Sequence, residues 1–295
     1  MRFSIYQDSN RGARAMNQDR MGFCYTRESL LMLVADGMGG HLHGDVASHL
    51  AVQAIAACFH VEARPALEDP PAFLDRALRL AHRELLHFAL QRGLPETPRT
   101  TIVACVVQTG RAWWAHAGDS RLYWIRKARL RARTYDHSKI QNLLDLGQID
   151  EFEAETHPER NKVLNCLGSP FEPVIDLGGD VALCTDDTLM LCTDGVWSAM
   201  DEDTLVACLS GAPVPDAVPL VVNEAVVRAG ATADNATVLA MNWEGLAPAR
   251  RLVSANSLAR LVPGSTTPPR EVSGGEGAGS RIGGLRRRML RIGAD

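Results

Sequence analysis

The sequence lacks the features that would indicate a membrane protein, a disulfide-stabilised protein or a zinc protein. Its longest clean apolar stretch, Leu30–Ala35, is far shorter than the roughly 20 residues of a membrane-spanning helix. The first twenty residues contain no apolar run, so a secretory signal peptide is not expected. The seven cysteines are odd in number and scattered, without a C-x-x-C pair. We therefore expect a cytoplasmic protein with reduced cysteines.

Charge is unevenly distributed, and most of the chain lacks a basic surface. The net charge is −4, but residues 249–295 hold nine arginines against three acidic residues, which leaves −10 on residues 1–248. Such an acidic body offers no broad track for a phosphate backbone, so a nucleic-acid partner is not expected. From Leu246 onward alanine, glycine, serine, proline and arginine dominate. This composition predicts a basic, mostly disordered tail over residues 246–295.

The remaining residues, 1–245, have the patterns of a folded body. An apolar fraction of 46% excludes collagen-like, coiled-coil and wholly disordered chains. Short apolar runs bounded by turn residues predict strands over Leu30–Ala35, Thr101–Gln108, Ala112–Ala117, Arg121–Ile125, Thr188–Cys192 and Thr237–Asn242. Helical spacing of apolar residues predicts helices over Ala47–Phe59, Pro71–Gln91, Asp201–Leu209 and Asp216–Arg228.

The order of these elements indicates how they are arranged. Strands 101–108, 112–117 and 121–125 follow one another through short glycine-containing links, which predicts an antiparallel meander. Strands and helices that come in separate blocks are typical of an α+β layered domain rather than a parallel βαβ array.

Four aspartates share one setting, in which an apolar strand ends and an aspartate beside glycine or asparagine follows. They are Asp36, Asp119, Asp194 and Asp234. Asp-Gly is also ordinary turn chemistry, but four such instances favour a shared role. Carboxylates without histidine or cysteine neighbours suit Mg²⁺ or Mn²⁺ rather than zinc. Arg14 is either a phosphate-binding arginine near this set or a solvated surface residue.

Six motifs in order resemble those of the bacterial metal-dependent protein phosphatases of the protein phosphatase 2C family. The matching segments are Arg14–Asp19, Val34–Gly40 with Gly44–Ser48, Gly118–Arg121, Asp136–Ser138, Asp194–Gly195 and Asp234–Asn235. The resemblance covers about residues 1–243 and leaves the tail outside. It implies a four-layer α-β-β-α sandwich with two central antiparallel sheets and a dinuclear metal cleft at one edge.

The resemblance also implies a ligand set for two Mn²⁺ or Mg²⁺ ions. Asp36, Asp194 and Asp234 would be direct ligands, with Asp36 bridging the two ions, and the Gly37 carbonyl would serve one of them. Asp19 would hold metal-bound water. A third, weaker ion would be shared by Asp119 and Asp194.

The implied reaction is hydrolysis of phosphoserine and phosphothreonine in proteins. Two metals roughly 3.5–4 Å apart share a bridging water and lower its pKa, so that a bridging hydroxide attacks phosphorus in line. Arg14 would bind the phosphoryl oxygens. His41 is either a substrate-side group that aids departure of the alkoxide or a surface histidine. No cysteine lies in a C-x5-R loop, which excludes a cysteine-dependent phosphatase.

A segment over about residues 139–168 resembles the mobile flap of the family. Two positions differ from the family pattern, because Arg99 stands where glycine is frequent and Asn165 where arginine is common. These differences leave the flap contacts open but keep the aspartate set intact.

Partners and rival functions follow from the same resemblance. Phosphorylated proteins would be substrates of a monomer that opposes a Ser/Thr kinase, and the basic tail either docks an anionic partner or is simply solvated. One alternative is a catalytically inactive phosphatase-like binding or sensing domain. Another is a metal nuclease that uses the same carboxylates, which the acidic body disfavours.

Overall fold

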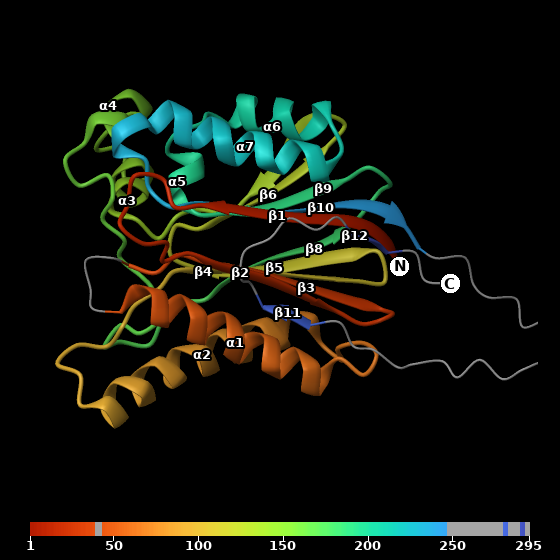
Figure 1. Ribbon diagram of the computed structural model, residues 1–295, viewed down its shortest axis with the longest axis horizontal. Helices are drawn as coiled ribbons and strands as arrows, with labels where there is room; N and C mark the ends of the chain where they lie inside the picture. The colour runs from red at the N-terminus through yellow and green to blue at the C-terminus, as the bar shows by residue number, and fades with distance from the viewer. Residues whose placement is uncertain (39–42, 247–279, 283–289, 293–295) are drawn as a thin grey trace, which may run out of the picture.

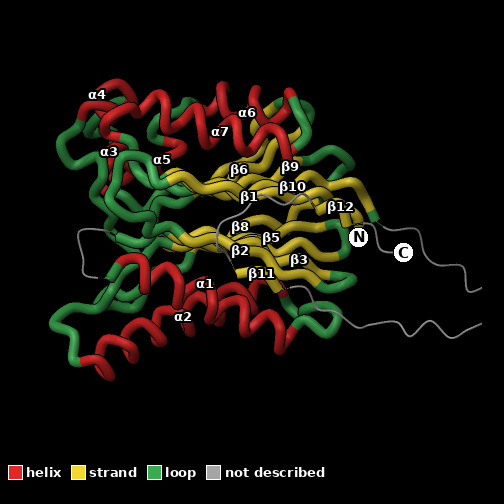
Figure 2. The backbone as a smooth tube through the Cα atoms, in the orientation of Figure 1, coloured by secondary structure: helices red, strands yellow, loops and turns green. Residues whose placement is uncertain are grey.

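The computed structural model describes residues 1–38, 43–246, 280–282 and 290–292. Two six-stranded antiparallel sheets pack face to face, and helices cover the outer side of each sheet (Figures 1 and 2). The predicted four-layer α-β-β-α sandwich is therefore confirmed. In the described part of the chain, no helix has the length and apolar character needed to cross a membrane.

The first sheet has the strand order β12-β1-β10-β9-β6-β7. Its strands are β12 (Leu290–Ile292), β1 (Arg2–Asn10), β10 (Ala236–Gly245), β9 (Thr188–Cys192), β6 (Arg121–Arg126) and β7 (Arg129–Arg133). Its outer face is covered by α5 (Asp194–Trp197), α6 (Glu202–Gly211) and α7 (Val214–Ala229), and α7 runs into a short 3-10 turn (Gly230–Thr232).

The second sheet has the order β11-β2-β3-β4-β5-β8. Its strands are β11 (Ser280–Ile282), β2 (Arg20–Tyr25), β3 (Ser29–Ala35), β4 (Ile102–Gln108), β5 (Arg111–Ala117) and β8 (Asp176–Ala182). Its outer face is covered by α1 (Gly44–Glu62) and α2 (Pro70–Arg92). Between β7 and β8 the chain forms two short helices, α3 (Lys139–Asp145) and α4 (Glu151–Thr156).

Strand β3 shows how one sequence run serves two cores. All of its residues are buried. Leu31 and Leu33 join the apolar cluster beneath α1 and α2, whereas Leu30 and Met32 join the cluster between the two sheets. Successive side chains of a strand point to opposite faces, so an uninterrupted apolar run suits a strand that is covered on both sides.

The predicted meander is only partly correct. β4 and β5 form the expected antiparallel hairpin, but β6 pairs with β9 and β7 in the other sheet. The outer edge of β5 is occupied by β8. Gly118, with φ +118°, sits where a Cβ atom would come within 2.5 Å of the Thr101 Cβ. Residues 118–120 therefore form a tight crossing between the sheets rather than a hairpin turn.

Two short strands lie within the predicted tail. β11 pairs with β2 and β12 pairs with β1, so each occupies the outer edge of one sheet. The rest of residues 247–295 lies outside the described residues, and disorder there stays a prediction.

Candidate functional site

The structure brings the predicted aspartates together at one end of the strands. Asp36 follows β3, Asp119 follows β5, and Asp194 follows β9. Asp19 and Asp234 immediately or nearly precede β2 and β10. Four of the five act through their charge on the pKa of another member, and Asp36 acts on the pKa of Asp194 through a side-chain hydrogen bond. We call these five residues the carboxylate cluster.

Burial and mutual repulsion raise the pKa values within this cluster. Burial is the main cause for Asp19 and Asp194, and it raises the pKa of Asp19 to about 8 and that of Asp194 to about 6. The pKa values of Asp36 and Asp119 are also raised by burial, with a further contribution from the neighbouring Asp194. Carboxylates this poorly neutralised form a site whose charge divalent cations complement.

One carboxylate oxygen of Asp19 is buried without a hydrogen-bond donor among the described residues. Its Oδ2 accepts a hydrogen bond of 2.8 Å from the Thr193 hydroxyl. Its Oδ1 is buried and has no hydrogen-bond partner among the described protein atoms. A buried acceptor without a donor is costly, and a water held against a cation would satisfy it. The residues present therefore fit a hydrated divalent ion.

Backbone packing explains why a glycine, Gly37, follows Asp36. The Asp36 carbonyl accepts hydrogen bonds from the Thr101 amide (2.9 Å) and the Thr100 hydroxyl (2.7 Å). A Cβ on Gly37 would stand 2.1 Å from the Gly44 carbonyl oxygen. Glycine is required at Gly37 because another backbone segment passes there, not because of a turn.

Asn235 ties the first loop of the chain to the last strand of the body. Its Oδ1 accepts from the Gln18 amide at 2.8 Å, and its Nδ2 donates to the carbonyls of Arg11 (2.8 Å) and Met16 (3.1 Å). Its own carbonyl oxygen lies where a Cβ on Gly195 would come within 2.1 Å. The sequence places Asn235 in one of the six motifs, but none of these contacts can be read from that motif.

Arg14 reaches the cluster from the exposed side. Its guanidinium forms an ion pair of 2.6 Å with Asp234, and the two side chains are 59% and 36% exposed. The predicted proximity of Arg14 to the carboxylates is thus present. His41 lies outside the described residues, so its role stays a prediction.

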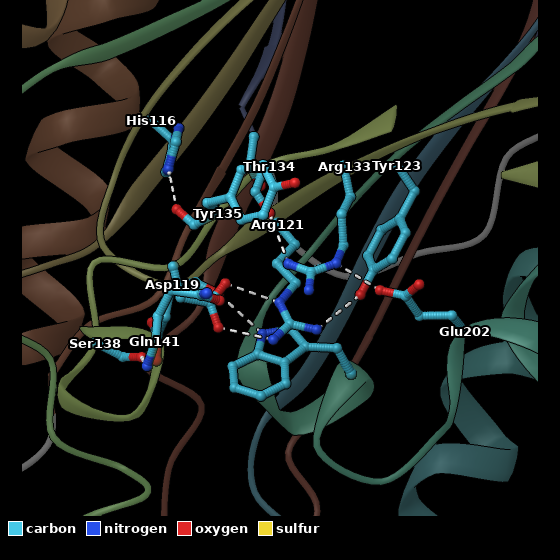
Figure 3. Close-up of polar contacts among 12 residues, drawn as sticks. His116, Asp119, Arg121, Tyr123, Arg133, Thr134, Tyr135, Ser138, Gln141 and Glu202 are labelled. Carbon is cyan, nitrogen blue, oxygen red and sulfur yellow. Dashed lines mark hydrogen bonds and ion pairs between the residues drawn. The ribbon is translucent and has the colours of Figure 1, made fainter. Parts of the chain in front are cut away.

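A buried ion pair behind Asp119 was not predicted. Arg121 donates to both carboxylate oxygens of Asp136 at 2.8 and 2.7 Å, and the two side chains are only 13% and 6% exposed. Arg121 also donates to the Tyr123 hydroxyl at 3.1 Å (Figure 3). Its guanidinium lies 3.7 Å from the centre of the Trp197 ring, and Trp197 donates its indole N–H to the Asp119 carbonyl at 2.9 Å. The network therefore fixes the backbone that carries Asp119.

Three other side chains have the residue types of a metal site. His116, His137 and Asp176 bring ligand atoms within 4.8 Å of one another, and no other group of three described residues does so. The two imidazoles stack nearly parallel, with centroids 4.6 Å apart and an interplanar angle of 14°. A metal ion lies in the plane of each imidazole that binds it, and two stacked rings share no such point. The stacking therefore contradicts a metal site.

The carboxylate cluster is less tightly gathered than that histidine group, because no three of its members bring ligand atoms within 4.8 Å of one another. Mg²⁺ and Mn²⁺ keep several of their waters, so they need fewer direct protein ligands than a closed site would supply.

Comparisons with known proteins agree with this geometry. Residues 6–211 match the family model described as Protein phosphatase 2C. The Serine/threonine phosphatase stp of Listeria monocytogenes is 32% identical over 191 residues, which cover 64% of this chain and 75% of that protein. The crystal structure of the Mycobacterium tuberculosis serine/threonine phosphatase PstP/Ppp is 29% identical, with a TM-score of 0.72 over 83% of this chain and all of that one. A PstP catalytic domain in complex with two manganese ions is 28% identical, with a TM-score of 0.69 over 82% of this chain and all of that one.

Proposed function

The chain belongs to the protein phosphatase 2C family and is a metal-dependent serine/threonine protein phosphatase, and we propose that the carboxylate cluster is its active site. One observation carries this proposal. Five aspartates from distant parts of the chain converge at one end of the strands, with an arginine beside them. Phosphorylated proteins are accordingly the substrates of this chain.

The proposed ligand set follows from the positions of the aspartates. Asp36, Asp194 and Asp234 would bind two divalent ions directly, with the Gly37 carbonyl as a further ligand. Manganese is favoured over magnesium because the related PstP catalytic domain was solved with two manganese ions. Asp119, buried beside Asp194, would contribute to a third and weaker site.

The residues of the chain divide the remaining work. When bound, the two cations supply an activated water and neutralise the dianionic phosphate. Asp19 would orient water through its unpartnered Oδ1. Arg14, exposed and paired with Asp234, would exchange this carboxylate for the phosphoryl oxygens and hold them through charge-assisted hydrogen bonds.

The direct test is Asp36→Asn, which removes one charge with little change in shape. We expect Mn²⁺-dependent turnover of p-nitrophenyl phosphate and of a phosphothreonine peptide to fall more than about 100-fold. Loss of a residue that only orients a metal ligand lowers activity by up to about 100-fold, so loss of a direct ligand should exceed this value. Asp203→Asn, at an exposed position on α6, is the matched control and should retain wild-type turnover. Turnover retained in Asp36→Asn would refute the proposed active site.

The rival of an inactive binding domain has a distinct signature. Such a domain would bind phosphopeptide in the presence of a chelator and release no phosphate. The proposed opposing Ser/Thr kinase, monomeric state and cytoplasmic location all stay predictions, as does docking of an anionic partner by the tail.

A further inference from the structure

We propose that His137 and Asn165 are positioning residues that couple the 139–168 segment to the turn carrying Asp119. We call residues 118–120 the Asp119 turn. This inference rests on the proposed function, because it takes Asp119 as part of the metal-binding cluster. It adds two residues and a connection that the ligand set does not contain.

His137 holds Gly118 from both sides. The His137 amide donates to the Gly118 carbonyl at 2.9 Å, and the Gly118 amide donates to His137 Nδ1 at 3.2 Å. A nitrogen that accepts a backbone N–H carries no proton, so the neutral ring bears its proton on Nε2. That nitrogen lies 3.1 Å from Asp176 Oδ2, although the two atoms are not aligned as a hydrogen bond. The two bonds to Gly118 therefore set the tautomer of the ring and its position against the Asp119 turn.

His116 supports the ring of His137 from one face. The two rings stack with centroids 4.6 Å apart. His116 is buried, and its Nε2 donates to the Tyr135 carbonyl at 2.6 Å (Figure 3). Since Tyr135 lies two residues before His137, this bond fixes the backbone on which His137 stands. A side chain held in this way returns to one geometry and can position what it contacts.

Asn165 connects the far end of the 139–168 segment to the same histidine. Its Nδ2 lies 2.7 Å from His137 Nδ1 and donates to the Val174 carbonyl at 2.8 Å. Its Oδ1 accepts from the Val174 amide at 3.1 Å. The paired bonds to Val174 determine which side-chain atom is oxygen and which is nitrogen. Both amide hydrogens thus have acceptors. One acceptor is His137 Nδ1, whose single lone pair is shared between Asn165 at 2.7 Å and the Gly118 amide at 3.2 Å.

The Asp119 turn is consequently fixed at three backbone atoms. His137 contacts the nitrogen and the oxygen of Gly118, and Trp197 donates to the carbonyl of Asp119. The Asp119 carboxylate itself is buried beside Asp194. Outer partners that orient a ligand commonly affect metal affinity by one to two orders of magnitude.

The same end of the segment is also tied to the other side of the cluster. Leu167 and Thr100 exchange backbone hydrogen bonds of 2.9 and 3.2 Å, and Thr100 also forms a bridge with Gly37. The hydroxyl of Thr100 donates to the Asp36 carbonyl at 2.7 Å. Movement of the 139–168 segment would therefore shift the backbone at both Asp36 and Asp119. His137 and Asn165 form the connection to Asp119.

The chain offers a matched set of variants for the test. Asn165→Ala removes the link, and His137→Gln moves the side-chain acceptor away from the Nδ1 position. His137→Asn keeps an acceptor close to Nδ1 and should rescue the link. Asn161→Ala, at an exposed position of the same segment, is the control.

Three measurements on the full chain distinguish positioning from simple support. Electron paramagnetic resonance titration of free Mn²⁺ gives the affinity of the weakest ion, and hydrogen exchange gives the protection of the Gly118 amide. Turnover of p-nitrophenyl phosphate gives the Mn²⁺ concentration at half-maximal rate. In Asn165→Ala and His137→Gln we expect roughly tenfold weaker binding of the weakest ion. In His137→Gln, which removes the acceptor of the Gly118 amide, we also expect faster Gly118 exchange. His137→Asn and Asn161→Ala should resemble wild type.

Two outcomes would overturn the inference. One is a lowered melting temperature in Asn165→Ala with unchanged Mn²⁺ binding, which would assign the residue a structural role only. The other is equal loss in Asn161→Ala. Failure of the proposed function appears elsewhere, as turnover retained in Asp36→Asn, whereas Gly118 exchange and Mn²⁺ titration report on the link independently of turnover.

Discussion

The inter-sheet core and the carboxylate cluster are built from the same strands but are held together in opposite ways. Along β3, Leu30, Met32 and Val34 fill the space between the sheets, and Asp36 takes the next position of the same alternation. Along β9, Leu189 and Leu191 belong to this core, and Asp194 follows shortly after. Apolar contacts stabilise one region, whereas like charges repel in the other.

This difference separates stability from activity within one sandwich. Substitutions in the core should unfold the protein without altering the chemistry of the folded fraction. Substitutions in the carboxylate cluster should abolish the chemistry and leave the metal-free fold as stable or more stable, because active sites commonly sacrifice stability for function.

The largest effect, a loss of activity together with a gain of stability, is expected from Asp194→Asn. Burial and the charge of Asp234 raise the pKa of Asp194, so removal of its charge relieves repulsion in the metal-free protein. Turnover with Mn²⁺ should fall more than about 100-fold, while the melting temperature in EDTA at pH 8 should rise. Phosphate release and thermal unfolding measure the two effects. A fall in both stability and turnover would mean that Asp194 supports the fold.

The reverse behaviour is expected from Leu191→Ala in the inter-sheet core. Leu191 is fully buried, so its truncation should lower the free energy of unfolding by about 2–5 kcal/mol. The Mn²⁺ concentration at half-maximal turnover should stay at the wild-type value. Urea unfolding followed by circular dichroism gives the first quantity. Leu220→Ala, exposed on α7, is the control and should change stability by less than about 0.5 kcal/mol.

The pH dependence of stability sharpens the comparison further. Burial raises the pKa of Asp19 from 3.8 to about 8, so between these values the native state holds a proton that the unfolded chain releases. The metal-free protein should therefore lose stability as the pH rises from about 4 to about 8. In Asp19→Asn this loss should be smaller, as thermal unfolding in EDTA at several pH values would show.

The sign should reverse when Mn²⁺ is present. Cations bind the deprotonated carboxylates, so their stabilising effect grows as the pH rises. Asp203→Asn should follow the wild-type curve under both conditions. A variant Asp19→Asn with the wild-type slope in EDTA would contradict the burial of a protonated Asp19.

The smallest effect on stability is expected from Arg14→Ala. The Arg14–Asp234 pair is largely exposed, and such pairs contribute no more than about 1 kcal/mol. Loss of a charge-assisted bond to phosphate should instead raise KM by roughly tenfold with a smaller change in kcat. Arg14→Lys keeps the charge but not the planar guanidinium, so its KM should lie between those of the wild type and Arg14→Ala. An unchanged KM in Arg14→Ala would remove its proposed role.

Much of the body could be predicted because local signals and packing agree. α2 was expected over 71–91 and spans Pro70–Arg92, with the Asp69 side chain accepting from the Ala72 amide and Gly93 in the left-handed conformation at its end. β1 was missed although Phe3 and Ile5 are buried and alternate with more exposed residues. β8 was missed for a better reason: most of its side chains are exposed, and only pairing with β5 defines it.

In the candidate site, too, residues marked by a local motif could be predicted, whereas roles that depend on contacts elsewhere in the chain could not. The aspartates could be found because each follows or precedes a strand in a recognisable motif. The roles of Asn235, Arg121 and His137 could not, since each depends on contacts with residues far away in the sequence. Arg121 and Asp136 stood in recognised motifs, but nothing in their spacing showed that they form a buried pair.

The bridges at the base of the 139–168 segment have an evolutionary consequence. Ser138 pairs with Val163 and Thr100 with Leu167, so the chain between them begins and ends at fixed points. At its outer part, Gly147 has open space where a side chain would stand. Insertions there would change the outer surface of the segment without moving the aspartates. The length and sequence of this part of the chain can therefore diversify while the carboxylate cluster stays in place.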